Sequence, residues 1–196
     1  MNPSRSPVEA VKALIRHQSA HMAHADISSH SVNKIALMLA WNGPLYPLYV
    51  LVLAGTGSLP GSLLTLIVSP LFYAIPWLMR WNTLAGRAAL PLVGAINTVW
   101  CMKLFGVDSG VGLFLYPCII LAALLFRQRE RWLMLPVLGT TLALEFLPAS
   151  VLGSPIIHVS PEAYARLTGL NAGSVAFLLA FIALQFVNIA RLSERD

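Results

Sequence analysis

Apolar positions along this chain gather in six long blocks, separated by short connections that carry glycine, proline or arginine. Each block has close to the length that a helix needs to cross the hydrocarbon core of a bilayer, about 20 residues. The six blocks are Ile35–Ala54, Ser62–Met79, Ala88–Phe105, Gly110–Phe126, Trp132–Leu152 and Asn171–Ala190. The pattern therefore predicts an all-α integral membrane protein, built as a six-transmembrane-helix bundle.

The segment before the first block has a different pattern. At about 100° per residue, its apolar side chains form one helical stripe, with charged residues on the far side. The stripe consists of Val8, Val11, Leu14, Ile15 and Met22. We therefore expect an amphipathic helix within a cytoplasmic, histidine-rich leader (1–34). The six-helix membrane domain follows (35–190), and 191–196 reads as the start of a cytoplasmic linker.

The composition agrees with this interpretation. Of the 196 residues, 57% are hydrophobic and 11% are charged, whereas soluble domains have roughly 25% charged residues. These values exclude a soluble enzyme, a nucleic-acid-binding protein and a disordered tail. The chain contains no HExxH, GxSxG or phosphate-binding glycine loop, so no catalytic residue is assigned.

The distribution of the basic residues predicts the orientation, because lysine and arginine beside a span stay on the cytoplasmic side. With both termini cytoplasmic, only Lys103 and Arg166 fall on the outer side. The basic residues on the inner side are Arg5, Lys12, Arg16, Lys34, Arg80, Arg87, Arg127, Arg129, Arg131, Arg191 and Arg195. This asymmetry predicts three pairs of spans, each turned at the outer face.

Polar residues inside the blocks are the main candidates for a functional site, because they are costly in hydrocarbon and tend to face a cavity. Glu145 is the only acid inside a block, and Asn42 and Asn97 lie at similar predicted depths. We hypothesise a central chamber formed by Asn42, Tyr46, Tyr73, Asn97, Trp100, Tyr116 and Glu145. The alternative is that the polar groups hold the bundle together by interhelical hydrogen bonds. Eight prolines inside the blocks favour kinked helices around such a chamber.

The histidines suggest a second kind of site. His17, His21 and His24 fall on one flank of the predicted amphipathic helix, and His30 follows shortly afterwards. With His158 from the outer loop, they are candidate ligands for haem b or a metal ion. One iron cannot use both groups, because His158 lies on the opposite side of the membrane. The alternative is a surface helix whose charge changes with pH.

Three features resemble the membrane sensor domain of bacterial α-hydroxyketone quorum-sensing histidine kinases. They are Gly43-Pro44-Leu45-Tyr46-Pro47-Leu48-Tyr49, the Arg127–Arg131 turn, and the outer loop with His158. The architecture is also similar to the six-span anchors of class III adenylate cyclases. The resemblance implies a homodimer in the bacterial inner membrane that senses a small lipophilic ligand. Its signal would pass through the last helix to a cytoplasmic output domain beyond Asp196.

The chain also departs from those proteins. Its 196 residues include no kinase or cyclase domain, so we expect either a piece of a longer protein or a stand-alone module. Two other functions stay open. One is a b-type haem membrane protein in redox sensing, gas sensing or electron transfer, and the other is a small transporter that uses Glu145.

Overall fold

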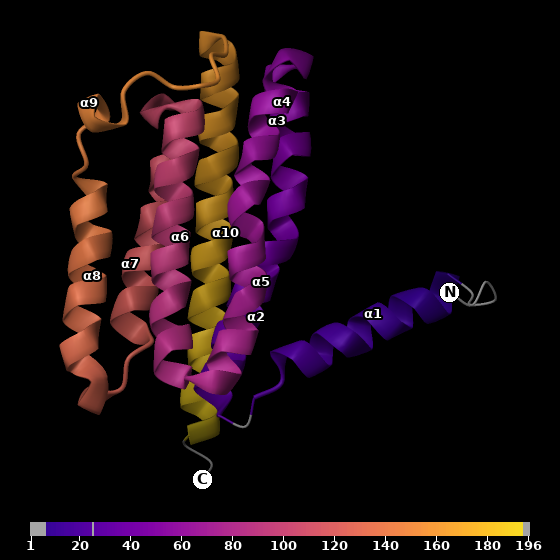
Figure 1. The fold of residues 1–196 in the computed structure, drawn as a ribbon, viewed down its shortest axis with the longest axis vertical. Coiled ribbons are helices and arrows are strands. Elements are labelled where there is room, and N and C mark those ends of the chain that lie inside the picture. The colour runs from indigo at the N-terminus through magenta and orange to yellow at the C-terminus, as the bar shows by residue number, and fades with distance from the viewer. Residues whose placement is uncertain (1–6, 25, 194–196) are drawn as a thin grey trace.

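The computed structural model describes residues 7–24 and 26–193, and all the regular structure in these ranges is helical (Figure 1). Helix α1 (Pro7–Met22) extends away from the other helices, which stand side by side as a bundle. The predicted amphipathic helix is present, but it ends at Met22, so His24 lies beyond it.

The first rod of the bundle consists of α2 (Ile27–Asn42) and α3 (Tyr46–Ala54). A short 3₁₀ segment, η1 (Gly43–Leu45), separates the two helices. It contains Pro44, which has no N–H group to continue an α-helical ladder. Helix α2 starts within the segment assigned to the leader, because Asp26 caps it by accepting a hydrogen bond from the Ser29 N–H at 3.0 Å.

Two further rods complete the first half of the bundle. The descending rod is η2 (Thr56–Ser58), α4 (Leu59–Ser62), η3 (Leu63–Val68) and α5 (Ser69–Trp81). The ascending rod is the single helix α6 (Thr83–Phe105). Asn82 forms a tight break between them, because its side chain accepts hydrogen bonds from the first free N–H groups of α6.

The second half contains two shorter helices and one long one. In chain order the elements are η4 (Val107–Ser109), η5 (Val111–Phe114), α7 (Leu115–Leu124), η6 (Gln128–Glu130), α8 (Arg131–Glu145), α9 (Ala149–Leu152) and α10 (Pro161–Ser193). The fifth predicted block is interrupted, because α8 ends at Glu145 and Pro148 precedes the separate helix α9. Helix α10 begins at Pro161, ten residues before the sixth predicted block (Asn171–Ala190).

Among the described residues, four helical segments are long and apolar enough to cross a membrane. They are Ser28–Ala54, Thr56–Trp81, Thr83–Phe105 and Pro161–Ala190. The segments Val111–Leu124 and Gln128–Glu145 meet this criterion as a pair, with a bend of 110° between them. The predicted all-helical class with several apolar spans is therefore confirmed, and the predicted number of six is discussed below.

Two buried apolar clusters fill the bundle at different heights. One includes Val32 and Ile35 from α2, Ile75 and Met79 from α5, and Leu90 from α6. The other lies toward the opposite end of the bundle and includes Val50 from α3, Leu104 and Phe105 from α6, Leu167 from α10, and Ile157 from the loop before α10. We call this second group the outer apolar cluster, because it lies at the end predicted to face outward. Together the two clusters pack α2, α3, α5, α6 and α10 against one another.

Charged side chains meet at the end of the bundle where α6 begins and α7 joins α8. Arg87 is only 2% exposed, and its Nη2 donates to Glu130 Oε1 at 2.6 Å. Arg127 Nη2 donates to Asp26 Oδ1 at 2.9 Å, and Asp26 in turn caps α2. We call Asp26, Arg87, Arg127 and Glu130 the ionic junction. It links α2, α6 and the turn between α7 and α8.

A candidate ligand cavity

A cavity of about 90 Å³ lies within the bundle, next to the break between α2 and α3. Its walls come from α2, η1, α3, η3, α5, α6 and η5. The lining residues are Leu39, Asn42, Gly43, Tyr46, Thr65, Ser69, Phe72, Asn97, Thr98, Cys101, Val111 and Phe114. The structure thus brings together three residues of the predicted chamber: Asn42, Tyr46 and Asn97.

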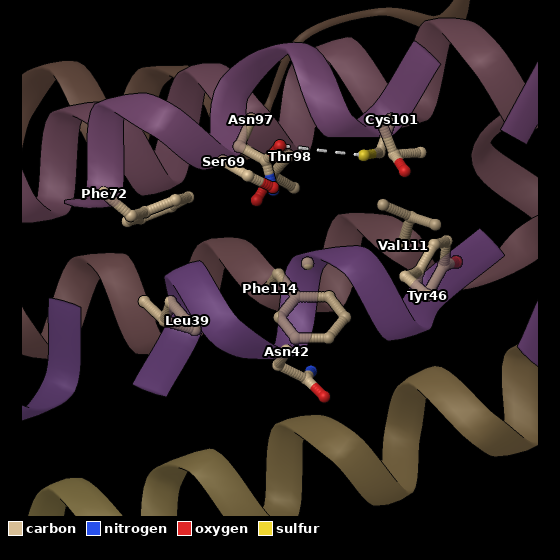
Figure 2. Close-up of a pocket in the computed structure, with 12 residues that line it drawn as sticks. Leu39, Asn42, Tyr46, Ser69, Phe72, Asn97, Thr98, Cys101, Val111 and Phe114 are labelled. Atoms are coloured by element: carbon tan, nitrogen blue, oxygen red, sulfur yellow. Dashed lines mark hydrogen bonds between the residues drawn. The ribbon is translucent and has the colours of Figure 1, made fainter. Parts of the chain in front are cut away.

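The polar side chains stand on opposite walls of this cavity. Figure 2 shows Ser69, Asn97 and Thr98 gathered on one side, with Phe72 next to them. The Asn42 carboxamide is on the other wall and points toward α10. The two asparagines therefore do not converge on one point, as the hypothesis of a single polar centre required.

The lining is uncharged and combines apolar surface with a few polar side chains. None of the described residues in the walls is Asp, Glu, Lys, Arg or His. Amides and hydroxyls offer hydrogen-bond donors and acceptors, and Leu39, Phe72 and Phe114 add apolar surface. Apolar cavities with a few polar groups are typical of sites for small molecules.

A groove of about 450 Å³ adjoins the cavity on the side of α10. Cavity and groove share Leu39, Asn42, Tyr46 and Phe114. The remaining walls are Met38, Tyr49, Gly169, Leu170, Gly173, Ser174, Phe177 and Leu178. The groove thus runs between the first rod and α10, and none of the described residues in its lining is charged.

Asn171 lies on α10 and forms a hydrogen bond with Tyr46 of the cavity wall. The sequence analysis did not identify this residue. The residue is completely buried, and its Oδ1 accepts a hydrogen bond from the Tyr46 hydroxyl at 3.2 Å. Its Nδ2 donates to the Ser109 carbonyl at 2.8 Å. A polar residue one-third of the way along an apolar helix is a recognisable signal. It was missed because the predicted span began at Asn171, which placed the residue at a helix end.

The other residues of the predicted chamber lie elsewhere. Trp100 packs against both apolar clusters, and its Nε1 donates to the Leu64 carbonyl at 2.9 Å. Tyr73 is 39% exposed and stacks on His21, with 4.8 Å between ring centroids. Tyr116, on α7, lies within hydrogen-bonding reach of Glu145 on α8 and is 45% exposed. None of these four residues lines the cavity.

Three histidines of the N-terminal segment form hydrogen bonds with backbone groups near the end of α1. His21 Nε2 donates to the Tyr73 carbonyl at 3.1 Å, and His30 Nδ1 donates to the Met22 carbonyl at 3.0 Å. His24 Nδ1 accepts the Asp26 N–H at 3.1 Å. His17 stacks beside His21, and His158 is exposed in the loop between α9 and α10.

Within residues 7–24 and 26–193, no three His, Cys, Asp or Glu side chains come together in a group that could hold a metal ion. The same part of the structure places Cys101 and Cys118 as free, buried thiols. Cys101 lines the cavity. Cys118 is outside the lining, and its Sγ donates to the Phe114 carbonyl at 3.2 Å.

The fold and the site describe an all-helical protein with several helices that have the length and apolar character of membrane spans. The sequence matches no protein-family model, and neither a curated protein nor a solved structure matches it.

Proposed function

We propose that this chain is a membrane receptor domain. It binds a small lipophilic ligand in the central cavity and passes a conformational signal along α10 to a cytoplasmic output domain. The observation that carries the proposal is the cavity itself. It is uncharged, lies beside a helix break, and is joined to α10 through Tyr46 and Asn171.

The proposal includes six spans with both termini on the cytoplasmic side. The chain changes direction by 110° between Val111–Leu124 and Gln128–Glu145, which supports counting them as two short spans. At about 1.5 Å per residue, the second of these is about 27 Å long. The α5–α6 turn, the α7–α8 turn and the C-terminal end of α10 lie at one end of the bundle (Figure 1). That end carries Arg80, Arg87 and the Arg127–Arg131 turn, as expected for the cytoplasmic side.

The ligand that fits this lining has a small neutral head and a hydrocarbon tail. Its head would bind to Asn97 and the neighbouring hydroxyls of Ser69 and Thr98. An ionised head would lose its hydration without gaining an opposite charge, at a cost of several kcal/mol. The tail would lie along Leu39 and Phe114.

Signal transfer follows from the position of Tyr46. A ligand changes the population of two conformations only if it binds one of them better. Tyr46 lines the cavity and donates its hydrogen bond to Asn171, so a ligand that moves Tyr46 changes the packing of α3 against α10. Helix α10 continues without an internal proline to Ser193, so it can transmit the displacement as a rigid element.

Binding of tritiated dodecanol to the protein in lipid nanodiscs tests the proposal. Because the lining is uncharged, dodecanol should bind more than about tenfold more tightly than dodecanoate or dodecyltrimethylammonium in competition. Asn97→Leu should weaken dodecanol binding by about tenfold, because it removes the polar anchor. Asn188→Leu is the matched control, since Asn188 is exposed on α10 and does not line the cavity. Equal effects of the two variants, or equal binding of the three amphiphiles, would contradict the proposal.

A further inference from the structure

The outer end of the bundle is closed over the cavity. The backbone N–H groups of Ile156 and Ile157 donate to the free carbonyls of Lys103 and Leu104 at 3.2 and 2.8 Å. Lys103 Nζ donates to the carbonyls of Leu152 and Ser154 at 2.9 and 2.8 Å. These bonds fasten the 153–160 loop across the end of α6.

The side chain of Ile157 adds an apolar contact to the closed outer end of the bundle. This side chain is buried in the outer apolar cluster and packs so closely on Gly61 that a Cβ there would lie 2.5 Å from Ile157 Cγ1. At the other end of the bundle, the buried side chains of Ile35, Ile75 and Met79 fill the space between α2 and α5. Packed apolar side chains of the described residues therefore lie at both ends of the bundle axis.

The groove beside α10 provides a lateral path. Gly169 and Gly173 form part of its wall, and an added Cβ at either position would meet no atom within 4 Å. The groove reaches the cavity at Asn42, Tyr46 and Phe114, which line both spaces. Its lining on α10 runs from Gly169 to Leu178, a rise of about 14 Å at about 1.5 Å per residue.

We propose that a single hydrocarbon chain occupies this groove, and that the groove is the route by which the ligand reaches the cavity from the bilayer. This inference rests on the proposed function. It adds the direction from which the ligand enters the cavity and the place where its hydrocarbon tail binds. The occupant is the tail of a neutral, single-chain amphiphile whose head lies in the cavity. The apolar, uncharged walls and their continuity with the cavity favour this occupant over a charged lipid or a peptide.

The route also explains how the tail contributes to the signal. A chain in the groove touches α10 directly at Gly169, Gly173 and Phe177 and touches the first rod at Tyr46 and Tyr49. It therefore lies between the two elements that the Tyr46 to Asn171 hydrogen bond joins. Head and tail would act on the same contact, which is the packing of α3 against α10.

Photolabelling with a dodecanol that carries a diazirine near its methyl end tests the route. In nanodiscs we expect adducts at the groove residues Tyr49 or Phe177, located by peptide mass spectrometry. Gly173→Leu should fill the groove and reduce these adducts by about tenfold, and it should reduce binding of tritiated dodecanol to a similar degree. Gly139→Leu on α8 is the matched control, because a Cβ at Gly139 also meets no atom within 4 Å and Gly139 lies outside the groove. Equal melting temperatures of the two variants would show that both fold.

The outcomes separate the two proposals. If Gly173→Leu binds tritiated dodecanol like the parent and Asn97→Leu does not, the cavity is the site but the groove is not its access route. If the parent protein shows no adduct in the groove while Asn97→Leu still weakens binding, the tail lies elsewhere and this inference is wrong. If neither variant changes binding, the receptor cavity fails, and the inference that rests on it fails too.

Discussion

The ionic junction and the central cavity both place polar side chains among apolar helices. The two regions differ in the partners that these side chains have. At the junction, Arg87 forms a salt bridge with Glu130, and Arg127 forms one with Asp26, so opposite charges are paired within the chain. In the cavity the polar groups are neutral amides and hydroxyls around free space. Paired charges fix the relative positions of helices, whereas neutral groups around a space can exchange their contacts with a ligand. The comparison assigns a structural role to the end of the bundle that carries the α5–α6 and α7–α8 turns, and ligand binding to the middle of the bundle.

The largest effect should come from breaking the buried ion pair. Arg87→Met leaves Glu130 without its charged partner, which should lower the free energy of unfolding by about 3–5 kcal/mol. Unfolding by denaturant in detergent micelles measures this loss. The double variant Arg87→Met with Glu130→Met should recover a large part of the stability, because it removes both charges. A loss below about 1 kcal/mol for Arg87→Met would show that the junction does not fix the helices.

A smaller effect is expected at the contact between cavity and α10. Asn171→Leu removes the partners of the Tyr46 hydroxyl and the Ser109 carbonyl, so it should cost about 1–3 kcal/mol of stability. Tyr46→Phe removes one of these two bonds and should cost about 1 kcal/mol. A double-mutant cycle on denaturant unfolding gives the coupling energy of the pair. Strictly additive losses would mean that Tyr46 and Asn171 are not energetically linked.

Acid should weaken the ionic junction through Asp26. Burial acts to raise the pKa of Asp26, but hydrogen bonds from Ser29 and the charges of Arg127 and Arg87 together lower it below its ordinary value of 3.8. A group with a lowered pKa stabilises the fold above its unfolded pKa, and this contribution is lost as the pH falls through the folded value.

Melting temperatures of the parent and Asp26→Asn between pH 7 and pH 2.5 check this prediction. Asp26→Asn retains a side chain that can cap α2, so the variant should lose about 1 kcal/mol or less at pH 7. The difference between the two proteins should shrink below the ordinary carboxyl pKa, because the parent then loses the same charge. A difference that stays constant over this range would be inconsistent with an ionised Asp26 in the junction.

The smallest effect is expected for Glu145→Gln. Glu145 lies beside Tyr116 between α7 and α8, and it does not line the cavity. Dodecanol binding should therefore change by less than about twofold, which is well below 1 kcal/mol. A change of about tenfold or more in dodecanol affinity would show that Glu145 belongs to the binding site, as the sequence alone had suggested.

The sequence predicted the parts of the fold that depend on hydropathy along one helix. The apolar blocks indicated the spans, and the stripe from Val8 to Met22 indicated α1. It missed the early start of α2, because the polar residues Ser29 and Asn33 interrupt the apolar pattern. Both are buried, and their side chains bind Asp26 and the Met22 carbonyl. Such pairing depends on tertiary contacts that no hydropathy window contains.

The candidate site was predicted only in part for a related reason. Matching depths grouped Asn42, Asn97 and Glu145, and the two asparagines line the same cavity, but depth does not determine which side of a helix a residue occupies. Glu145 therefore joined the predicted chamber although it faces Tyr116 on the neighbouring helix α7. Asn171 was assigned to a helix end, because the first turns of α10 contain charged residues such as Glu162 and Arg166.

The two cysteines allow the most direct test of the central claim, that a neutral amphiphile occupies the cavity. Both thiols are buried to the same degree, but Cys101 lines the cavity and Cys118 does not. The rates of their modification by methyl methanethiosulfonate, a small neutral reagent, can be followed in nanodiscs by mass spectrometry. At a dodecanol concentration about ten times its Kd, modification of Cys101 should slow by about tenfold, and that of Cys118 should stay unchanged. Equal slowing of both thiols, or no slowing of Cys101, would contradict a ligand in this cavity.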